Sequence, residues 1–165
     1  MFRSAAGSGN LEAVKEFLND GVDVNSSSNR GYTALISSSL RGHTAVVKIL
    51  LENGADVNAR DNDGDSPLMA SISKGHTDVA KLLLENGADA NMKDKQGVTP
   101  IIKAASKGDT EIVRILLIKG ADVNARSYRN ETALMAAEKN GNKEIADLIR
   151  EKEASAKVVE KKSLK

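Results

Sequence analysis

The sequence predicts an all-α solenoid of stacked helix–turn–helix units with β-turn fingers, and three ladders of glycine support this prediction. Within the 165 residues, glycines recur every 33 residues in three registers. The ladders are Gly21, Gly54, Gly87 and Gly120; Gly9, Gly42, Gly75, Gly108 and Gly141; and Gly31, Gly64 and Gly97, with Asn130 on the fourth rung. A fixed period of this length is typical of stacked supersecondary units, because no single unit buries its apolar face alone. We therefore expect function to reside in a surface that several units share.

Each unit opens with a turn that has Asp or Ser first and Gly or Asn last, which is ordinary turn chemistry. The four turns are Ser28-Asn-Arg-Gly31, Asp61-Asn-Asp-Gly64, Asp94-Lys-Gln-Gly97 and Ser127-Tyr-Arg-Asn130. A hydroxyl residue then caps a helix, followed in two units by proline, which favours the first helical position. These helix starts are Thr33-Ala, Ser66-Pro, Thr99-Pro and Thr132-Ala. The helix is short, for example Leu68 to Lys74, and ends at a glycine of the second ladder.

A second helix begins directly after that glycine. Asn10, Asp109 and Asn142 are good N-caps for it, and His43 and His76 occupy the same position in their units. Apolar residues follow at helical spacing. They include Val46, Val47, Leu50, Leu51, Val79, Leu82, Leu83, Ile112, Leu116 and Leu117. The glycines of the first ladder then end this helix in a left-handed conformation. The predicted unit is turn, helix, turn, helix and extended finger.

This pattern resembles the ankyrin repeat. Thr99-Pro-Ile-Ile-Lys-Ala-Ala105 stands where that family begins its first helix with Thr-Pro-Leu-His, and Gly-Ala-Asp-Val-Asn is the family's link into the next finger. The resemblance covers residues 2 to about 152 and implies one ankyrin repeat domain over 1–152. Its units are 2–26, 27–59, 60–92, 93–125 and 126–152, and residues 153–165 form a charged tail that we expect to be flexible.

Two departures from the family pattern affect the expected packing. The family's histidine after Thr-Pro-Leu is replaced by Ile36, Met69, Ile102 and Met135, so apolar packing is expected to replace the hydrogen bonds that the imidazole makes there. Ser37-Ser-Ser39 replaces small apolar residues in the first helix of its unit. Because serine competes for backbone hydrogen bonds, this unit is expected to be the weakest by helix propensity.

Composition narrows the possible functions. The 24 basic residues balance 23 acidic ones, whereas proteins that bind phosphate backbones concentrate positive charge. The sequence has no cysteine, which excludes disulfides, thiolate catalysis and cysteine-based metal sites and fits a cytoplasmic location. No apolar stretch approaches the ~20 residues needed to cross a bilayer. The N-terminus lacks the apolar core of a secretory signal. We therefore expect a soluble chain.

The candidate catalytic and metal-binding groups each have a structural explanation. His43 and His76 lie on the same rung of adjacent units. Stacked helices are ~8–10 Å apart, so the two rings cannot share a zinc ion bound at ~2.0–2.1 Å. Aspartate and asparagine recur once per unit, which indicates that they hold loops together rather than converge as a catalytic pair. They are Asp56, Asp89 and Asp122 with Asn58, Asn91 and Asn124. Gly7-Ser-Gly9 lacks the rest of a phosphate loop. We expect no enzyme activity, no metal and no cofactor.

The family resemblance also implies a binding surface, which we call the concave strip: the finger tips and the exposed side of each first helix. Carried over residue by residue, the strip consists of Asn29, Arg30, Tyr32, Leu40, Arg41, Arg60, Asn62, Asp63, Asp65, Ser73, Lys74, Lys93, Lys95, Gln96, Val98, Ser106, Lys107, Arg126, Tyr128, Arg129, Glu131, Lys139 and Asn140. Ten of these are basic and three acidic, a charge of +7 on a chain whose total is +1. Such a strip favours an acidic partner surface.

The sequence therefore predicts a monomeric, non-catalytic protein–protein interaction module. The expected contact residues are Arg30, Tyr32, Arg41, Arg60, Lys74, Lys93, Lys107, Tyr128 and Arg129. Two alternatives stay open. One is a nucleic-acid-binding adaptor that uses the same basic strip, although the strip lacks interleaved aromatic residues for base stacking. The other is an engineered scaffold with no natural partner, against which the varied fingers argue.

Overall fold

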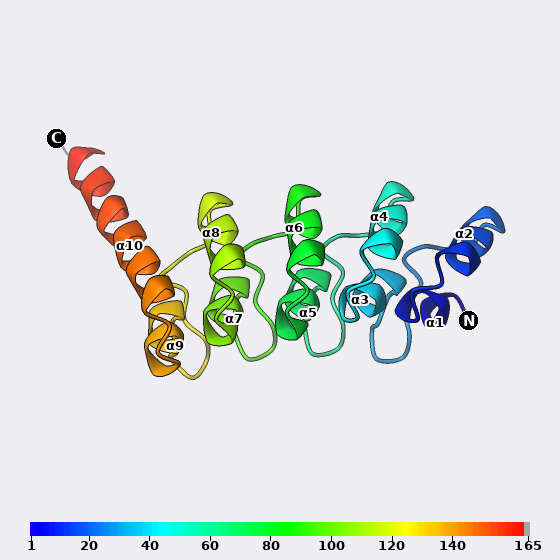
Figure 1. Cartoon of the computed structure of the whole chain (residues 1–165), viewed down its shortest axis with the longest axis horizontal. Coiled ribbons are helices and arrows are strands. Elements are labelled where there is room, and N and C mark those ends of the chain that lie inside the picture. Colours follow the sequence, from blue (N-terminus) through cyan, green and yellow to red (C-terminus); the bar gives the residue numbers. More distant parts are fainter. Residues whose placement is uncertain (164–165) are drawn as a thin grey trace.

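The computed structural model describes the backbone of residues 1–163 and the side chains of residues 1–156. Within this range it contains ten α-helices and no strand, which confirms the all-α prediction. The helices are α1 (Phe2–Gly7), α2 (Leu11–Asn19), α3 (Ala34–Ser39), α4 (Thr44–Glu52), α5 (Pro67–Lys74), α6 (Thr77–Glu85), α7 (Pro100–Lys107), α8 (Thr110–Ile118), α9 (Ala133–Lys139) and α10 (Lys143–Ser163). They form two rows, with the odd-numbered inner helices beside the finger loops and the even-numbered outer helices behind them (Figure 1).

All four predicted helix starts are present, and three of them have the capping hydrogen bond. The hydroxyl oxygens of Thr33, Ser66 and Thr132 each accept a hydrogen bond from the amide three residues later. Thr99 occupies the same position, but its buried hydroxyl has no hydrogen-bond partner among the described residues. At the outer helices, Asn10 caps α2 and the sequence prediction holds. Asp109 also caps α8, whereas His43 and His76 stand at the N-cap positions of α4 and α6 without a side-chain capping hydrogen bond.

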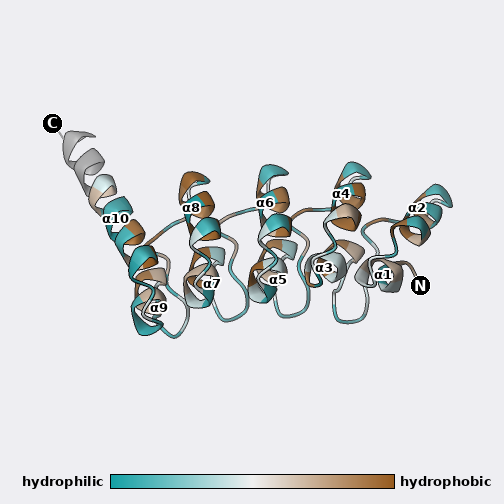
Figure 2. Cartoon of the chain, in the orientation of Figure 1, coloured by the Kyte–Doolittle hydropathy of each residue, from teal (hydrophilic) through white to brown (hydrophobic). Residues whose placement is uncertain are grey.

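The core lies between the two rows of helices. Each middle unit contributes a leucine or isoleucine from its inner helix and a leucine from its outer helix, and all of them are fully buried. These residues are Leu35, Leu68 and Ile101 on the inner helices and Leu50, Leu83 and Leu116 on the outer helices. Hydropathy colouring shows apolar and hydrophilic bands alternating along the helices of both rows (Figure 2). Because each face is covered by its neighbours, stability is shared between adjacent units.

The repeating aspartates and asparagines hold the loops, as the sequence predicts. The Asn58 side chain accepts a hydrogen bond from the Asp89 amide at 2.8 Å and donates one to the Gly87 carbonyl. Asn25 makes the same pair of bonds to the following unit, and so does Asn91. Neighbouring fingers are also joined through the backbone, where the Lys95 amide donates to the Asp63 carbonyl at 2.9 Å. The loops therefore form a continuous hydrogen-bonded edge.

Apolar packing replaces the family's histidine in three units but not in the last. Ile36, Met69 and Ile102 are at most 2% exposed. Met135, on the same rung, is 50% exposed, so the packing expected for it is absent. The reason is geometric: the other three side chains are covered by the next unit, and within the described residues no unit follows α9.

Helix α10 continues well beyond the length of the other outer helices. It includes residues 153–163 of the predicted tail, whereas Leu164 and Lys165 lie outside the described residues. That the tail is flexible, and that the domain ends at residue 152, stay predictions. Among the described residues no helix combines the length and the apolar character that a membrane span requires.

The serine triplet in α3 leaves one buried hydroxyl without a partner. The Ser38 hydroxyl donates to the carbonyls of Ala34 and Leu35, and the Ser37 hydroxyl donates to that of Thr33. Ser39 is fully buried, and its hydroxyl has no hydrogen-bond partner in the described part of the chain. The equivalent residue two units further along the chain is Ala105, which is equally buried. Burying the Ser39 hydroxyl without a hydrogen bond therefore lowers the stability of the folded chain.

We expect Ser39→Ala to stabilise the chain by ~1 kcal/mol, because it removes an unsatisfied buried hydroxyl and adds a stronger helix former. Ser38→Ala is the matched control. Its hydroxyl is satisfied, so that substitution should bring no gain. Urea denaturation of both variants measures the difference. If Ser39→Ala stabilises no more than Ser38→Ala, the Ser39 hydroxyl is not an energetic burden.

The close approach of neighbouring fingers makes Gly31 difficult to replace. Gly31 has φ of +80°, and a Cβ there would lie 2.8 Å from the Asp61 Cα and 2.9 Å from the Asn62 amide nitrogen. Gly54 has nearly the same φ, +81°, but a Cβ there would meet nothing within 4 Å. Comparing substitutions at these two glycines therefore distinguishes the effect of backbone strain from that of crowding between fingers.

Gly54→Ala should cost only the left-handed backbone penalty, ~1–2 kcal/mol. Gly31→Ala should cost at least ~1 kcal/mol more, because backbone atoms of the next finger have to move. Chemical denaturation of the two variants is the measurement. Equal losses would mean that the fingers separate freely and do not contribute to the stacking of units.

Candidate functional site

The concave strip is built from the finger loops and the inner helices. No strip residue is buried, and all ten basic side chains of the strip are exposed. Five of the predicted contact residues line two grooves, whereas Arg60, Lys93, Tyr128 and Arg129 line neither. One groove contains Arg30, Tyr32 and Arg41, and a second contains Lys74 and Lys107. Residues of the finger and of the inner helix thus lie side by side, although they are separated in the sequence.

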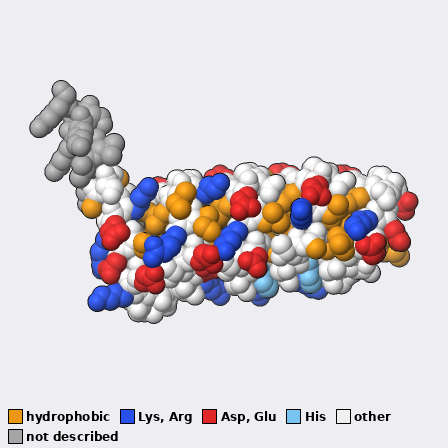
Figure 3. All heavy atoms as spheres, turned by 45° about the horizontal axis from the view of Figure 1, so that its top comes forward, with side chains coloured by type: hydrophobic (Ala, Val, Ile, Leu, Met, Phe, Trp, Pro, Cys, Tyr) orange, Lys and Arg blue, Asp and Glu red, His pale blue; other side chains and the backbone are white. Residues whose placement is uncertain are grey.

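The ion pairs among the residues whose side chains are described lie almost entirely away from the strip. Outer helices are joined by pairs such as Lys81 with Glu111 and Arg114 with Glu144. Space filling shows basic and acidic side chains intermixed with apolar ones on the face formed by the outer helices (Figure 3). By contrast, none of the ten basic strip residues forms an ion pair with any side chain that the structure describes. The basic side chains of the strip are therefore not neutralised by ion pairs within the part of the chain whose side chains are described.

Two of the predicted contact residues also hold the structure together. The Arg60 guanidinium donates a hydrogen bond to the Lys93 carbonyl in the next finger, and it lies over Gly64. The Arg41 guanidinium donates to the Gly7 carbonyl at 3.2 Å. Arg60 is thus more than the simple exposed charge that the sequence suggests, because it links adjacent fingers.

The groove between α5 and α7 has a volume of about 390 Å³ and contains charges of both signs. Lys103, which the sequence analysis did not select, points into it and pairs with Asp65 at 3.1 Å. Burial raises the pKa of Asp65 above its usual 3.8, and the Lys103 charge opposes that rise. Because the pKa is raised in the folded chain, the stability contributed by this group increases as the pH falls toward 3.8.

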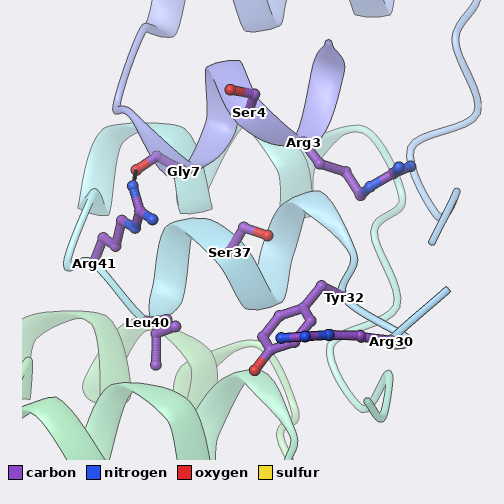
Figure 4. Close-up of a pocket in the computed structure, with 8 residues that line it drawn as sticks. All are labelled: Arg3, Ser4, Gly7, Arg30, Tyr32, Ser37, Leu40 and Arg41. Carbon is purple, nitrogen blue, oxygen red and sulfur yellow. Dashed lines mark hydrogen bonds between the residues drawn. The ribbon is translucent and has the colours of Figure 1, made fainter. Parts of the chain in front are cut away.

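The groove between α1 and α3 has a volume of about 350 Å³, and its charge differs from that of the groove between α5 and α7. Three arginines line it: Arg3 from α1, Arg30 from the first finger and Arg41 from the turn that follows α3. Hydroxyl groups of Ser4 and Tyr32 also line it, and no carboxylate does. Figure 4 shows Arg41 entering from one end of the groove, with Arg3, Arg30 and Tyr32 toward the other.

Neither histidine stands in a metal-binding arrangement. The His43 Nε2 lies 3.0 Å from the Gly7 carbonyl, so its ring ties α1 to the second unit. Its ring also covers Gly9, where an added Cβ would be 2.7 Å from Nδ1; His76 covers Gly42 in the same way. Among the described residues there is no cluster of three or more histidine, aspartate or glutamate side chains that could hold a metal ion.

Comparison with known proteins identifies the family. A model of ankyrin repeats in three copies matches residues 2–94 and 86–161. The chain belongs to the ankyrin repeat family. A search of curated proteins found no match. Ankyrin repeats are generally protein–protein interaction modules and typically lack catalytic activity, so the family places this chain among interaction proteins.

Sequence reasoning missed two strip-facing residues for different reasons. Arg3 lies on the rung of Ile36 and Ile102, which are buried, so its register predicted a packed side chain. Lys103 shares its rung with Ala70, which is buried. In both cases the position within the repeat predicts a buried side chain. Only the residue type, arginine or lysine, indicates that a charge faces the grooves of this ankyrin repeat domain.

Proposed function

We propose that this ankyrin repeat protein binds a protein partner with an acidic surface through the concave strip. One observation supports this proposal above all: ten exposed basic side chains lie along the strip, and none is paired with an acidic residue in the described part of the chain. An acidic partner would supply the missing counter-charges and would be attracted at long range.

Binding would proceed by docking onto a preformed surface. The fingers are held by backbone hydrogen bonds between units and by the asparagine ladder, so little chain needs to be ordered on association. The strip residues that we expect to contact the partner are Arg30, Tyr32, Arg41, Arg60, Lys74, Lys93, Lys107, Tyr128 and Arg129. Tyr128 is 76% exposed, which suits an aromatic anchor.

The proposal also includes a monomeric chain that acts without catalysis in the cytoplasm. The absence of cysteine supports a reducing compartment. The acid–base candidates, which are the two histidines and the repeated aspartates, recur along the units rather than converge in one pocket, and this favours a binding function over an enzymatic one.

A nucleic acid is the second candidate partner, because the same unpaired positive charge would attract phosphates. The strip contains only two aromatic residues, Tyr32 and Tyr128, for base stacking. A nucleic-acid partner would show a steep salt dependence of binding, and DNA or RNA titrations at two salt concentrations distinguish it from a protein partner.

Affinity capture from a cell lysate tests the proposed function. The parent chain is compared with a variant in which Arg60, Lys74, Lys93 and Lys107 are changed to glutamate. We expect acidic proteins to be retained by the parent and lost from the variant. Retention of the same proteins by both would place the binding site outside the strip.

A further inference from the structure

We propose that the groove between α1 and α3 recognises a phosphate monoester, specifically a phosphorylated serine or threonine of the protein partner. This inference rests on the proposed function, because it assigns a ligand class to one end of the concave strip. Arg3, Arg30 and Arg41 come from three separate segments and line a single pocket. The pocket therefore concentrates more positive charge than any one element supplies.

The arginines of this groove are available to a ligand. None of the three forms an ion pair with a described side chain, and the guanidinium groups of Arg3 and Arg30 have no hydrogen bond within residues 1–156. Arg41 is oriented by its bond to the Gly7 carbonyl, which leaves its other donors free (Figure 4). Like charges gathered without a counter-ion repel one another, and a bound anion would relieve that repulsion.

Hydroxyl groups also line the groove. The hydroxyls of Ser4 and Tyr32 line it, and neither has a hydrogen-bond partner among the described residues. The Ser37 hydroxyl is already engaged, because it donates to the Thr33 carbonyl at 2.8 Å. Figure 4 shows the three guanidinium groups spread along the groove, so the long Arg3 and Arg30 side chains would turn toward a common anion on binding. A phosphate suits such a groove, because it has three acceptor oxygens and a charge near −2. A carboxylate has one charge and two oxygens and would leave donors unused.

The groove between α5 and α7 is a partly neutralised counterpart. Its Lys103 is paired with Asp65, and Glu131 lines the same groove. The groove between α1 and α3 has no such carboxylate in its lining. At about 350 Å³, its volume is within the range of ligand pockets and accommodates a phosphorylated side chain. Phosphate recognition is thus assigned to this groove and not to the strip as a whole.

The test is an NMR titration of the full chain at fixed ionic strength with three short peptides. They carry phosphoserine, aspartate or serine between alanines. We expect saturable shifts of the arginine side-chain signals of the pocket with phosphoserine, at least ~10-fold weaker binding with aspartate, and none with serine. Equal binding of the phosphoserine and aspartate peptides would overturn the proposal. Inorganic phosphate is titrated separately, and binding as tight as that of the peptide would assign the pocket to free phosphate and overturn the partner assignment.

Variants locate the binding. Arg3→Gln and Arg30→Gln should each weaken phosphoserine binding by about 10-fold, since each removes charge-assisted hydrogen bonds. Neither guanidinium has a described structural bond, so the fold should be preserved. Lys139→Gln is the matched control, because Lys139 is exposed on the strip at the far end, in α9, and should change binding by less than about 2-fold. Equal effects of all three would indicate general attraction of anions and overturn the proposal.

The outcome is separable from that of the proposed function. The variant used for lysate capture changes residues outside this pocket. If that variant loses capture and the parent chain does not bind phosphoserine, the strip remains the proposed binding surface and the phosphate site in the groove between α1 and α3 is rejected. If phosphoserine binding depends on Arg3 and Arg30 but the charge reversal leaves capture unaffected, only the proposal of a partner with a wider acidic surface is rejected.

Discussion

Reversing Arg60, Lys74, Lys93 and Lys107 to glutamate should abolish partner binding and should act mainly on the association rate. The change replaces four exposed positive charges near the middle of the strip by four negative ones. Long-range attraction to an acidic partner then becomes repulsion, and the loss should be greatest at low salt. Surface plasmon resonance with the captured partner, at low and moderate salt, separates the association and dissociation rates.

The fold should survive this reversal. Three of the substitutions are at exposed lysines and should change stability by ~0.5 kcal/mol each. Arg60→Glu should cost ~1 kcal/mol, because it removes the hydrogen bond to the Lys93 carbonyl. Tyr32→Ala tests another part of the surface, since losing a half-buried aromatic anchor should accelerate dissociation instead.

A charge-matched control separates position from net charge. Lys48, Lys119, Lys143 and Lys152 are exposed and lie on or next to the outer helices. Their reversal to glutamate changes the net charge by the same amount but leaves the strip intact, so partner binding should persist. If the control loses binding as fully as the strip variant, or if the strip variant still binds tightly at low salt, the strip is ordinary solvated surface.

Leu83→Ala should destabilise the chain by ~2–5 kcal/mol, because it leaves a cavity at the centre of a middle unit. Leu83 is fully buried in α6, which packs against both α4 and α8. Neighbours on both sides hold the surrounding helices in place, so the cavity cannot readily collapse. Guanidinium denaturation followed by circular dichroism measures the loss.

The equivalent Ile149→Ala should cost less, even though Ile149 is also fully buried. Helix α10 packs against α8 on one side, and within the described residues no outer helix covers its other side. A terminal helix relaxes around a cavity or frays locally without unfolding the rest. Equal losses at residues 83 and 149 would contradict a capping role for the last unit.

Periodicity alone predicts most of the local structure. Glycines every 33 residues with positive φ, hydroxyl caps and apolar spacing specify where helices begin and end, because these depend on backbone conformation and nearest neighbours. The loop-holding role of Asn58 and its equivalents follows from the same logic, since a residue that recurs once per unit serves each unit. The basic character of the strip follows from the sequence only together with the family resemblance, which implies where the strip lies.

The repeat pattern does not predict side-chain contacts between units. Met135 has the register of Ile36 but is half exposed, because burial on that rung depends on whether another unit covers it. Arg60 bonds to a carbonyl 33 residues away, Lys103 pairs with Asp65, and Arg3 joins Arg30 and Arg41 around one groove. Each of these depends on how flexible side chains meet across stacked units, and periodicity places backbones in register without specifying where the ends of long side chains lie. The architecture is therefore a property of local sequence, whereas the grooves and their charges exist only after the units have stacked.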